Sequence, residues 1–430
     1  MLSQKIIITI EKLVFGGEGL GYFNGRPVFV FGVLPGEEVE VVPVKVRKKY
    51  IKAKLVKVLQ AAAERVEPEE DHYLSCSPWQ VIPYDKQLKY KVDLTKENWQ
   101  YLSGRLPQPK VEIVPSQNIW HYRNKMEFSL TEDKQGRLVY AWHERYLYDR
   151  LVEVDKCKLA ADRINSCAQQ VLQQLQGKLK LEQIKNILLR YSFYEDKCLG
   201  VLFVKDKDIA PISVQVEGLV GWQIVYSNPL SPAAVVSKVL LDEGRGFLVE
   251  EVAGLYFRYG YHNFFQVNPR TFSCLIQDVL PQVNPGKVGV DLYAGVGIIG
   301  QLLAGKFDKM IAVELDRAAA EIAKENAKEN NLADKFVSLS GATEKQDLGM
   351  ILSSAHTVIL DPPRGGMHKR VIGQLLSALP EQIVYISCNP ATQARDWQKL
   401  RDKYQVDFWR LYDFYPHTPH IESVLIMHRR

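Results

Sequence analysis

The sequence lacks the features that mark secreted and membrane-inserted proteins. Its six cysteines stand far apart with no paired spacing, which is not the pattern of a disulfide-rich secreted domain. No apolar run approaches the ~20 residues that a membrane-spanning helix needs, and the first residues show no basic segment followed by a long apolar core. We therefore expect reduced thiols, no membrane partner and a cytoplasmic location.

Neither sign of charge dominates the chain, but its positive charge is unevenly placed. The net charge is +5, and residues 1–60 contain ten Lys and Arg against five Glu. The basic excess thus lies in the N-terminal segment, as expected for a surface that meets a polyanion. With 430 residues, of which 46% are apolar, the chain can bury a large core and form two or three domains.

The spacing of apolar residues predicts two domains before residue 261. Short alternating runs separated by glycine turns predict a small β-barrel in residues 1–59, and a polar linker followed by mixed patterns predicts an α+β central domain in residues 60–260. The last barrel strands are basic around Tyr50. Such a face can simply be solvated, but it also suits single-stranded nucleic acid. Its cationic residues are Lys45, Arg47, Lys48, Lys49, Lys52 and Lys54.

Residues 261–430 alternate apolar strands with amphipathic helices. This alternation predicts an α/β fold with a doubly wound parallel sheet. In such sheets ligands bind at the carboxyl ends of the strands. The expected strands are Lys287–Tyr293, Met310–Glu314, Val358–Asp361 and Ile383–Cys388, with a helix at Ala318–Asn330.

The first of these strands leads into a glycine-rich turn, Asp291-Leu-Tyr-Ala-Gly-Val-Gly-Ile-Ile-Gly300. Such a turn lets the backbone approach a ligand closely, although it can also be only a tight strand-to-helix connection. The next strand ends in Glu314, whose carboxylate can accept hydrogen bonds from two ribose hydroxyls. These two features fit a nicotinamide dinucleotide and S-adenosylmethionine equally well.

The third and fourth strand ends separate these two cofactors. They carry Asp361-Pro-Pro-Arg-Gly-Gly366 and Ser387-Cys-Asn-Pro390, which places a carboxylate and a thiol at the crevice. A hydride-transfer enzyme has no use for a cysteine directed at the substrate carbon, whereas a pyrimidine methyltransferase needs one as its nucleophile. For Cys388 taken alone, the alternative is a small buried hydrophobe.

Together with His417-Thr-Pro-His-Ile-Glu422, these motifs resemble the family of RNA uracil-5 methyltransferases, in both its ribosomal and its tRNA branches. Tyr122-Arg-Asn-Lys125 and Phe264-Phe-Gln-Val-Asn268 extend the resemblance, and the N-terminal, OB-like barrel resembles the TRAM domain. The resemblance implies a Rossmann-like domain that uses S-adenosylmethionine to make 5-methyluridine in RNA. Because the barrel is common in the ribosomal branch, we expect 23S ribosomal RNA as the substrate, with tRNA as the nearest alternative.

The resemblance also implies roles for individual residues. Cys388 would add to carbon 6 of uracil, which makes carbon 5 nucleophilic toward the methyl group, and Glu422 would then remove the carbon 5 proton. Taken alone, Glu422 could equally be a surface charge. The residues expected to bind the cofactor are Gln266, Tyr293, Glu314 and Asp361. Those expected to hold RNA around an unpaired or flipped uridine are Arg123, Asn124, Lys125 and Arg364.

The chain departs from the family pattern at two places. Ile298 stands where relatives commonly have asparagine. Many relatives also hold a four-iron, four-sulfur cluster on four cysteines, but here only Cys157 matches a ligand position, and Cys76 falls where a glycine is expected. Two thiols cannot supply four thiolates, so we expect no cluster. The spacing of His72, Cys76 and Cys157 fits no standard zinc pattern, so we expect no metal either.

Two further functions remain as alternatives. The chain could be a catalytically silent RNA-binding factor on the same scaffold, which the presence of Cys388 and Glu422 argues against. A nicotinamide dehydrogenase would leave the Asp-Pro-Pro-Arg and Ser-Cys-Asn-Pro motifs without a role. No protein partner is expected from any feature of the sequence.

Overall fold

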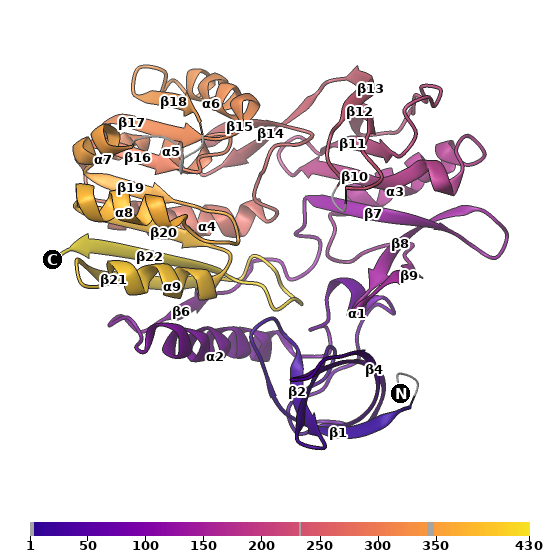
Figure 1. Cartoon of the computed structure of the whole chain (residues 1–430). Coiled ribbons are helices and arrows are strands. Elements are labelled where there is room, and N and C mark those ends of the chain that lie inside the picture. The colour runs from indigo at the N-terminus through magenta and orange to yellow at the C-terminus, as the bar shows by residue number, and fades with distance from the viewer. Residues whose placement is uncertain (1–3, 232–233, 342–347) are drawn as a thin grey trace.

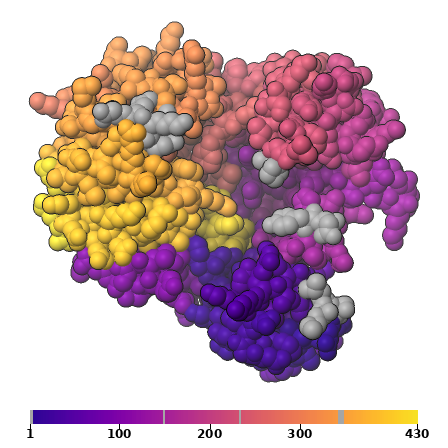
Figure 2. All heavy atoms as spheres, in the orientation of Figure 1, coloured from indigo at the N-terminus to yellow at the C-terminus, as the bar shows by residue number. Residues whose placement is uncertain are grey.

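The computed structural model describes residues 4–231, 234–341 and 348–430. The N-terminal barrel lies below two larger domains (Figure 1), and these two face each other across a recess (Figure 2). In the described part of the chain, no helix is both long enough and apolar enough to cross a membrane.

The N-terminal domain is a closed β-barrel, as the alternating pattern predicted. In its first strand Ile6, Ile8 and Ile10 point into the barrel and are buried, which is the period of two that a strand imposes. Asn24 and Gly25 form the tight turn between the second and third strands, and both have positive φ. The strands, in the order β1-β2-β3-β5-β4 around the barrel, are β1 (Ile6–Leu13), β2 (Gly19–Phe23), β3 (Arg26–Val30), β4 (Glu38–Val46) and β5 (Ile51–Gln60).

The central domain is built on a mixed sheet with the strand order β13-β12-β11-β10-β7-β8-β9. Helix α3 (Asp162–Leu175) covers one region of β10 and β11, and the hairpin of β14 and β15 packs against the same two strands. This double cover explains why the run Cys198–Val204 is buried at every residue. The strands are β7 (Lys125–Glu132), β8 (Leu138–Glu144), β9 (Leu147–Glu153), β10 (Ile184–Ser192), β11 (Lys197–Val204), β12 (Leu219–Tyr226), β13 (Lys238–Gly244), β14 (Phe247–Val252) and β15 (Leu255–Gly260). The short helices are α1 (Tyr73–Cys76) and the 3-10 turn Leu181–Gln183.

The C-terminal domain is the predicted doubly wound sheet, with the order β18-β17-β16-β19-β20-β22-β21-β6. The chain builds outward from β16 in one direction and then returns to add β19 and β20 on its other side, which makes a topological switch between β16 and β19. The strands are β6 (Glu112–Val114), β16 (Gly286–Leu292), β17 (Phe307–Glu314), β18 (Phe336–Ser340), β19 (Thr357–Leu360), β20 (Gln382–Ser387), β21 (Tyr404–Tyr412) and β22 (Glu422–Arg429). The helices are α2 (Tyr84–Ser103), α4 (Pro269–Val279), α5 (Ile298–Leu303), α6 (Arg317–Glu329), α7 (Gly349–Ser354), α8 (Lys369–Ala378), α9 (Pro390–Leu400) and the 3-10 turns Leu280–Gln282 and Ala304–Lys306.

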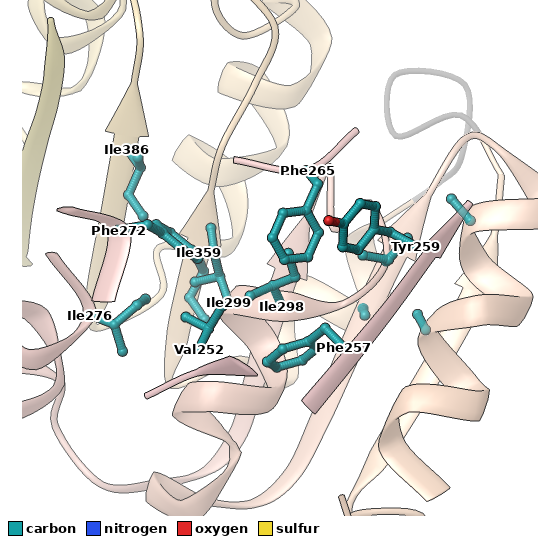
Figure 3. Close-up of a cluster of buried hydrophobic side chains, with 14 of the residues drawn as sticks. Val252, Phe257, Tyr259, Phe265, Phe272, Ile276, Ile298, Ile299, Ile359 and Ile386 are labelled. Carbon is teal, nitrogen blue, oxygen red and sulfur yellow. The ribbon is translucent and has the colours of Figure 1, made fainter. Parts of the chain in front are cut away.

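One hydrophobic core joins the central and C-terminal domains. Phe257 and Tyr259 of the β14–β15 hairpin pack with Phe265 and Phe272 (Figure 3). Ile298 belongs to the same cluster and is only 7% exposed. The side chain at this departure from the family pattern therefore fills the core.

The expected boundary of the central domain differs from the structure. Residues 60–260 include α2 and β6, but α2 packs against α9, and β6 pairs in parallel with β21 of the C-terminal sheet. The physical anchor is Trp99, which is fully buried between Trp397 and Trp409 at ring distances of 5.4 and 4.9 Å. This segment therefore leaves the barrel, crosses to the C-terminal domain and only then enters the central sheet.

Candidate active site

The glycine-rich turn after β16 brings a buried carboxylate close to a helix. Asp291 Oδ2 accepts a hydrogen bond from the Gly300 amide at 2.9 Å, and a Cβ at Gly300 would lie 2.8 Å from that same oxygen. Gly297 begins α5 with φ +82°, a conformation that L side chains rarely adopt. The turn therefore needs its glycines for backbone geometry.

Glu314 lies at the end of β17 and is held by this turn. Its Oε2 accepts a bond from the Gly295 amide at 2.7 Å, and its Oε1 accepts one from the Asp316 amide at 2.9 Å. Each carboxylate oxygen has a second lone pair, so both oxygens can also accept hydrogen bonds from a ligand. This is the geometry expected of a ribose-binding carboxylate at a strand end.

Tyr293 follows β16 directly and has φ +66°, which is unusual for a side chain of its size. It packs in part against the core and in part borders a surface pocket of about 480 Å³ that Met367 and Arg395 also line. The ring can therefore both pack against the core and contact a molecule bound in the pocket.

Gln266 lies on the segment between β15 and α4. Its side chain is 4% exposed, and its Oε1 has no hydrogen-bond partner among the described residues. The Oδ1 atom of Asp291 is buried without a partner in the same way. Because unpartnered buried acceptors are costly, both atoms are suited to receive a donor from a bound molecule.

Cys388 lies directly after β20 and is half-buried. Burial, followed by the negative charge of Glu422, raises the pKa of its thiol to about 11, and Arg364 opposes this shift. The thiol is therefore mainly protonated at neutral pH, and forming the thiolate depends on nearby positive charge.

The Ser-Cys-Asn-Pro motif has a structural basis as well as a chemical one. Asn389 caps α9 by accepting a bond from the Ala391 amide at 3.1 Å, and its Nδ2 donates to the Arg364 carbonyl at 3.0 Å. Pro390 is the first residue of α9, a position where the missing N–H costs nothing. The motif thus ties the loop of Cys388 to the loop that follows Asp361.

Glu422 begins β22 and is 3% exposed. Strand β22 runs antiparallel to β20, and Ser387 pairs with Ser423, so the next step of the register places Cys388 opposite Glu422. Burial and then the charge of Asp361 raise the pKa of Glu422 well above its ordinary value. The predicted nucleophile and base therefore meet at neighbouring strand ends.

Asp361 completes a group of closely placed acids. It follows β19, and burial raises its pKa to about 7. The pKa of Asp291 rises to about 8 through burial, against the Gly300 hydrogen bond, and the charges of Asp361 and Glu314 add to the rise. A cationic ligand favours the ionised forms of Asp291 and Asp361, so bound positive charge would offset the raised pKa values at this crevice.

Three functional residues escaped the analysis of the sequence. Tyr415 donates a hydrogen bond to Glu422 Oε1 at 3.2 Å. Lys91 Nζ lies 2.6 Å from Asp413 Oδ1 and 3.1 Å from the Tyr415 carbonyl, and both charged side chains are fully buried. The available signal was the row Gln87, Lys91, Thr95 and Trp99 at four-residue spacing, which marks one buried face of α2.

The structure corrects one expected RNA contact. Asn124 is 1% exposed, and its Nδ2 donates to the Gln266 carbonyl at 3.0 Å, so its side chain joins two protein segments. Arg123 and Lys125 are half-buried, and Arg123 Nε donates to the Lys125 carbonyl at 3.1 Å. Arg364 is exposed beside Cys388 and stays a candidate for contacting RNA.

The basic face of the barrel divides into paired and exposed cations. Lys52 forms an ion pair with Glu18, and Lys54 forms one with Glu144 of the central domain. The remaining four cations of this face are exposed at the end of β4 and in the turn that leads to β5; they are Lys45, Arg47, Lys48 and Lys49.

The residues around Cys76 do not fit a four-thiolate cluster. In the described part of the chain, the groups that meet there are the thiols of Cys76 and Cys157 and the carboxylate of Glu70. A four-iron, four-sulfur cluster needs four protein ligands, normally thiolates. These residues offer only two.

Comparison with known proteins identifies two family models along the chain. The tRNA (uracil-5-)-methyltransferase model matches residues 237–430, and the TRAM domain model matches residues 1–56. The second match coincides with the β-barrel, and the first covers both Cys388 and Glu422.

Relatives that align over nearly their whole length are named as RNA methyltransferases. An uncharacterised RNA methyltransferase from Fusobacterium nucleatum is 28% identical, with 100% of this chain and 97% of that protein covered. One from Caldanaerobacter subterraneus is 29% identical, with 99% of each covered. The fold resembles that of the Pyrococcus abyssi tRNA (uracil-54, C5)-methyltransferase, with a TM-score of 0.78, 24% identity and coverage of 98% of this chain and 100% of that one.

Proposed function

We propose that this chain, which matches the tRNA (uracil-5-)-methyltransferase and TRAM family models, methylates carbon 5 of a uridine in 23S ribosomal RNA, with S-adenosylmethionine as the methyl donor. The observation that carries the proposal is the register of β20 and β22, which sets Cys388 opposite Glu422. A thiol and a carboxylate so placed can act on the same pyrimidine ring, one as nucleophile and one as base.

The strand-end residues suit S-adenosylmethionine in their chemistry. The cofactor carries a sulfonium, an ammonium and two ribose hydroxyls, and it has no phosphate. The crevice offers the acidic side chains of Asp291, Glu314 and Asp361 and the unpartnered acceptor of Gln266. We assign cofactor binding to Glu314, Asp361, Gln266 and Tyr293. The pyrophosphate of a nicotinamide dinucleotide would disfavour ionisation of Asp291 and Asp361, whereas the positive charges of S-adenosylmethionine favour it.

The chemistry of the reaction assigns one task to each catalytic side chain. The Cys388 thiolate forms a bond from Sγ to carbon 6, and the π electrons of the ring move onto the carbon 4 oxygen. When bound, the cofactor supplies an electrophilic methyl group, which carbon 5 takes up. The Glu422 carboxylate then accepts the proton of carbon 5, the bond between Sγ and carbon 6 breaks, and the double bond of the ring is restored.

Electrostatics decides when Cys388 can react. Because its pKa is raised to about 11, only a small fraction is thiolate at neutral pH, and that fraction rises tenfold with each pH unit below 11. Arg364 favours the thiolate, whereas an ionised Glu422 opposes it. Productive binding therefore has to bring positive charge to the thiol, and the exposed guanidinium of Arg364 is one source.

The preference for ribosomal RNA rests on the barrel, and tRNA is the second candidate. The fold likeness to the P. abyssi tRNA enzyme extends over 98% of this chain, so an attached barrel is compatible with either substrate. The exposed cations at the turn between β4 and β5 can hold the backbone of both RNAs. The target uridine must be unpaired or flipped out, since carbon 6 is inaccessible in a stacked helix.

The deciding experiment supplies methyl-labelled S-adenosylmethionine and the enzyme to ribosomal RNA and tRNA from cells that lack this gene. We expect label in 5-methyluridine of ribosomal RNA. Label only in tRNA would move the substrate to the second candidate. No label in either pool, with the cofactor still bound, would favour a silent RNA-binding factor and would overturn the catalytic proposal.

A further inference from the structure

A group of soft and hard donor atoms lies outside the active site, where α1 meets the loop that follows β9. One donor atom each from Glu70, Cys76 and Cys157 lie within 4.8 Å of one another. Helix α1 sits between the barrel and the strands β8 and β9 (Figure 1). Because residues 70 and 157 are far apart in the sequence, only the fold brings these atoms together.

His72 lies beside this group and can supply a fourth donor, although its ring nitrogens are not among the atoms that lie within 4.8 Å of one another. Its Nε2 lies 2.7 Å from the Lys156 carbonyl, which can only accept, so Nε2 carries a hydrogen. Its Nδ1 lies 3.7 Å from Cys76 Sγ. Ligand atoms around a tetrahedral zinc ion are separated by about 3.5 Å, given metal–ligand distances of about 2.0–2.3 Å. A metal-binding histidine usually donates its other N–H to a carbonyl in this way.

The carboxylate of Glu70 is buried and oriented. Its side chain is 8% exposed, its Oε1 accepts a bond from the Lys158 amide at 2.6 Å, and its Oε2 accepts one from Gln80 Nε2 at 2.8 Å. Its Oε1 also lies 3.5 Å from His72 Nε2, and in the described ranges no lysine or arginine side chain forms an ion pair with it. A buried carboxylate of this kind is usually paired with a cation or bound to a metal.

The spacing in the sequence predicted no metal here, but the fold brings the donor atoms together, and we propose that Glu70, Cys76 and Cys157 bind one soft divalent cation, with zinc as the best fit and His72 as the fourth ligand. Two thiolates, one imidazole and one carboxylate are all ligands that zinc takes in tetrahedral sites. Binding would displace the remaining thiol protons to solvent. The site differs from the four-thiolate cluster of many relatives in its ligands, and it takes no part in the methyl transfer.

Such a site would fix the barrel relative to the central domain. The segment that carries Cys76 touches both: Leu74 lies so close to the barrel that a Cβ at Gly32 would meet its Cδ2 at 2.4 Å, and the Leu74 carbonyl accepts a bond from Arg145 Nε at 2.7 Å. The loop of Cys157 belongs to the central domain. A metal bound by these segments would therefore cross-link the region beside the barrel to the central domain.

The test measures metal content on the full-length protein expressed with added zinc and dialysed extensively. We expect about one zinc per chain, and we expect cobalt(II) that replaces it to show thiolate-to-cobalt charge-transfer absorption. Cys157→Ser and Cys76→Ser should lose both signals. Cys198→Ser is the matched control, because Cys198 and Cys167 are a second buried thiol pair without a carboxylate or imidazole in the group.

Several outcomes would overturn the proposal. They are wild-type protein that takes up neither zinc nor cobalt, retention of the metal by Cys157→Ser, a disulfide between Cys76 and Cys157 in protein isolated without reductant, and iron with inorganic sulfide in the anaerobically purified protein. If the serine variants do not fold, wild-type protein decides: a zinc chelator should lower its thermal midpoint, and zinc but not magnesium should restore it. A thermal midpoint that the chelator leaves unchanged would contradict a structural metal at this site.

Discussion

Two groups of buried polar side chains meet the two ends of residues 413–422, and they differ in how their charges are compensated. At the C-terminal end, Glu422 faces Cys388, and burial raises the pKa values of both, so that each favours its neutral form. At the N-terminal end, Asp413 forms an ion pair of 2.6 Å with Lys91, and neither side chain is exposed. The first group is left short of partners and can react. The second is paired and holds the backbone.

The comparison separates the contacts that hold residues 413–422 in place from the side chains, Cys388 and Glu422, that are expected to react. The Asp413 carboxylate accepts bonds from Lys91 Nζ and from the Tyr415 amide, which fixes the start of the segment. His417 in the same segment stacks on Trp120 at 3.8 Å and exchanges bonds with Gln87 of α2. The backbone that carries Glu422 is therefore held in place by these contacts, whereas the protonation state of the Glu422 carboxyl can change.

The largest effect is expected from removing the nucleophile. Cys388→Ala should lower methyl transfer by at least about 10⁴-fold and should abolish covalent RNA adducts, because it removes the thiolate that adds to carbon 6 and makes carbon 5 nucleophilic. Label transfer and denaturing gels of the protein with RNA measure the two. Cys274→Ala, at another half-buried free thiol, is the control and should keep both activities. Normal turnover by Cys388→Ala would show that Cys388 is not the nucleophile.

Removing the base should separate the two halves of the reaction. Glu422→Gln should lower turnover by about 10²–10⁴-fold, while the adduct with RNA accumulates because the proton of carbon 5 cannot leave. A shifted protein band on denaturing gels measures the adduct. Glu325→Gln, on the exposed face of α6, should do neither. A variant that turns over slowly without accumulating adduct would place the proton transfer on another group.

The paired group should respond in stability. Lys91→Met leaves the Asp413 carboxylate buried without its cation, and we expect a loss of about 3–5 kcal/mol, seen as a lower urea midpoint. Lys89→Met, exposed on the same helix, is the control. The double variant Lys91→Met with Asp413→Asn removes the unpaired charge and should recover much of the loss. No recovery would mean that Lys91 stabilises the fold by something other than this pair.

The sequence predicted the regular parts of the C-terminal domain because they depend on local pattern. The expected strand Ile383–Cys388 is β20, Gln382–Ser387, and the expected helix Ala318–Asn330 is α6, Arg317–Glu329. The closed barrel followed in the same way from alternation and glycine turns. In each case the apolar period alone determines the element, whichever partner it later contacts.

Long-range pairing could not be predicted from local pattern. Helix α2 has a polar buried face with Lys91 on it, so its docking on the C-terminal domain depends on Asp413, which lies more than 300 residues away. Asn124 is of a residue type that can hydrogen-bond a base, yet its side-chain amide donates a hydrogen bond to the Gln266 carbonyl. The roles of Cys388 and Glu422 stay predictions, because they rest on chemistry that only the reaction can test.

The smallest expected effect links the two groups. Tyr415→Phe keeps the ring and the backbone bonds to Lys91 and Asp413 but removes the hydroxyl that donates to Glu422 Oε1. That hydrogen bond lowers the pKa of Glu422, so its loss should raise the pKa further. Since the base acts as a carboxylate, resolution of the adduct should need a higher pH, and it should slow by about tenfold near neutrality for one pKa unit. Adduct formation through Cys388 should change much less. If Tyr415→Phe leaves the pH dependence of adduct resolution unchanged, Tyr415 acts only through packing. The ionisation of Glu422 would then be independent of the Tyr415 hydroxyl.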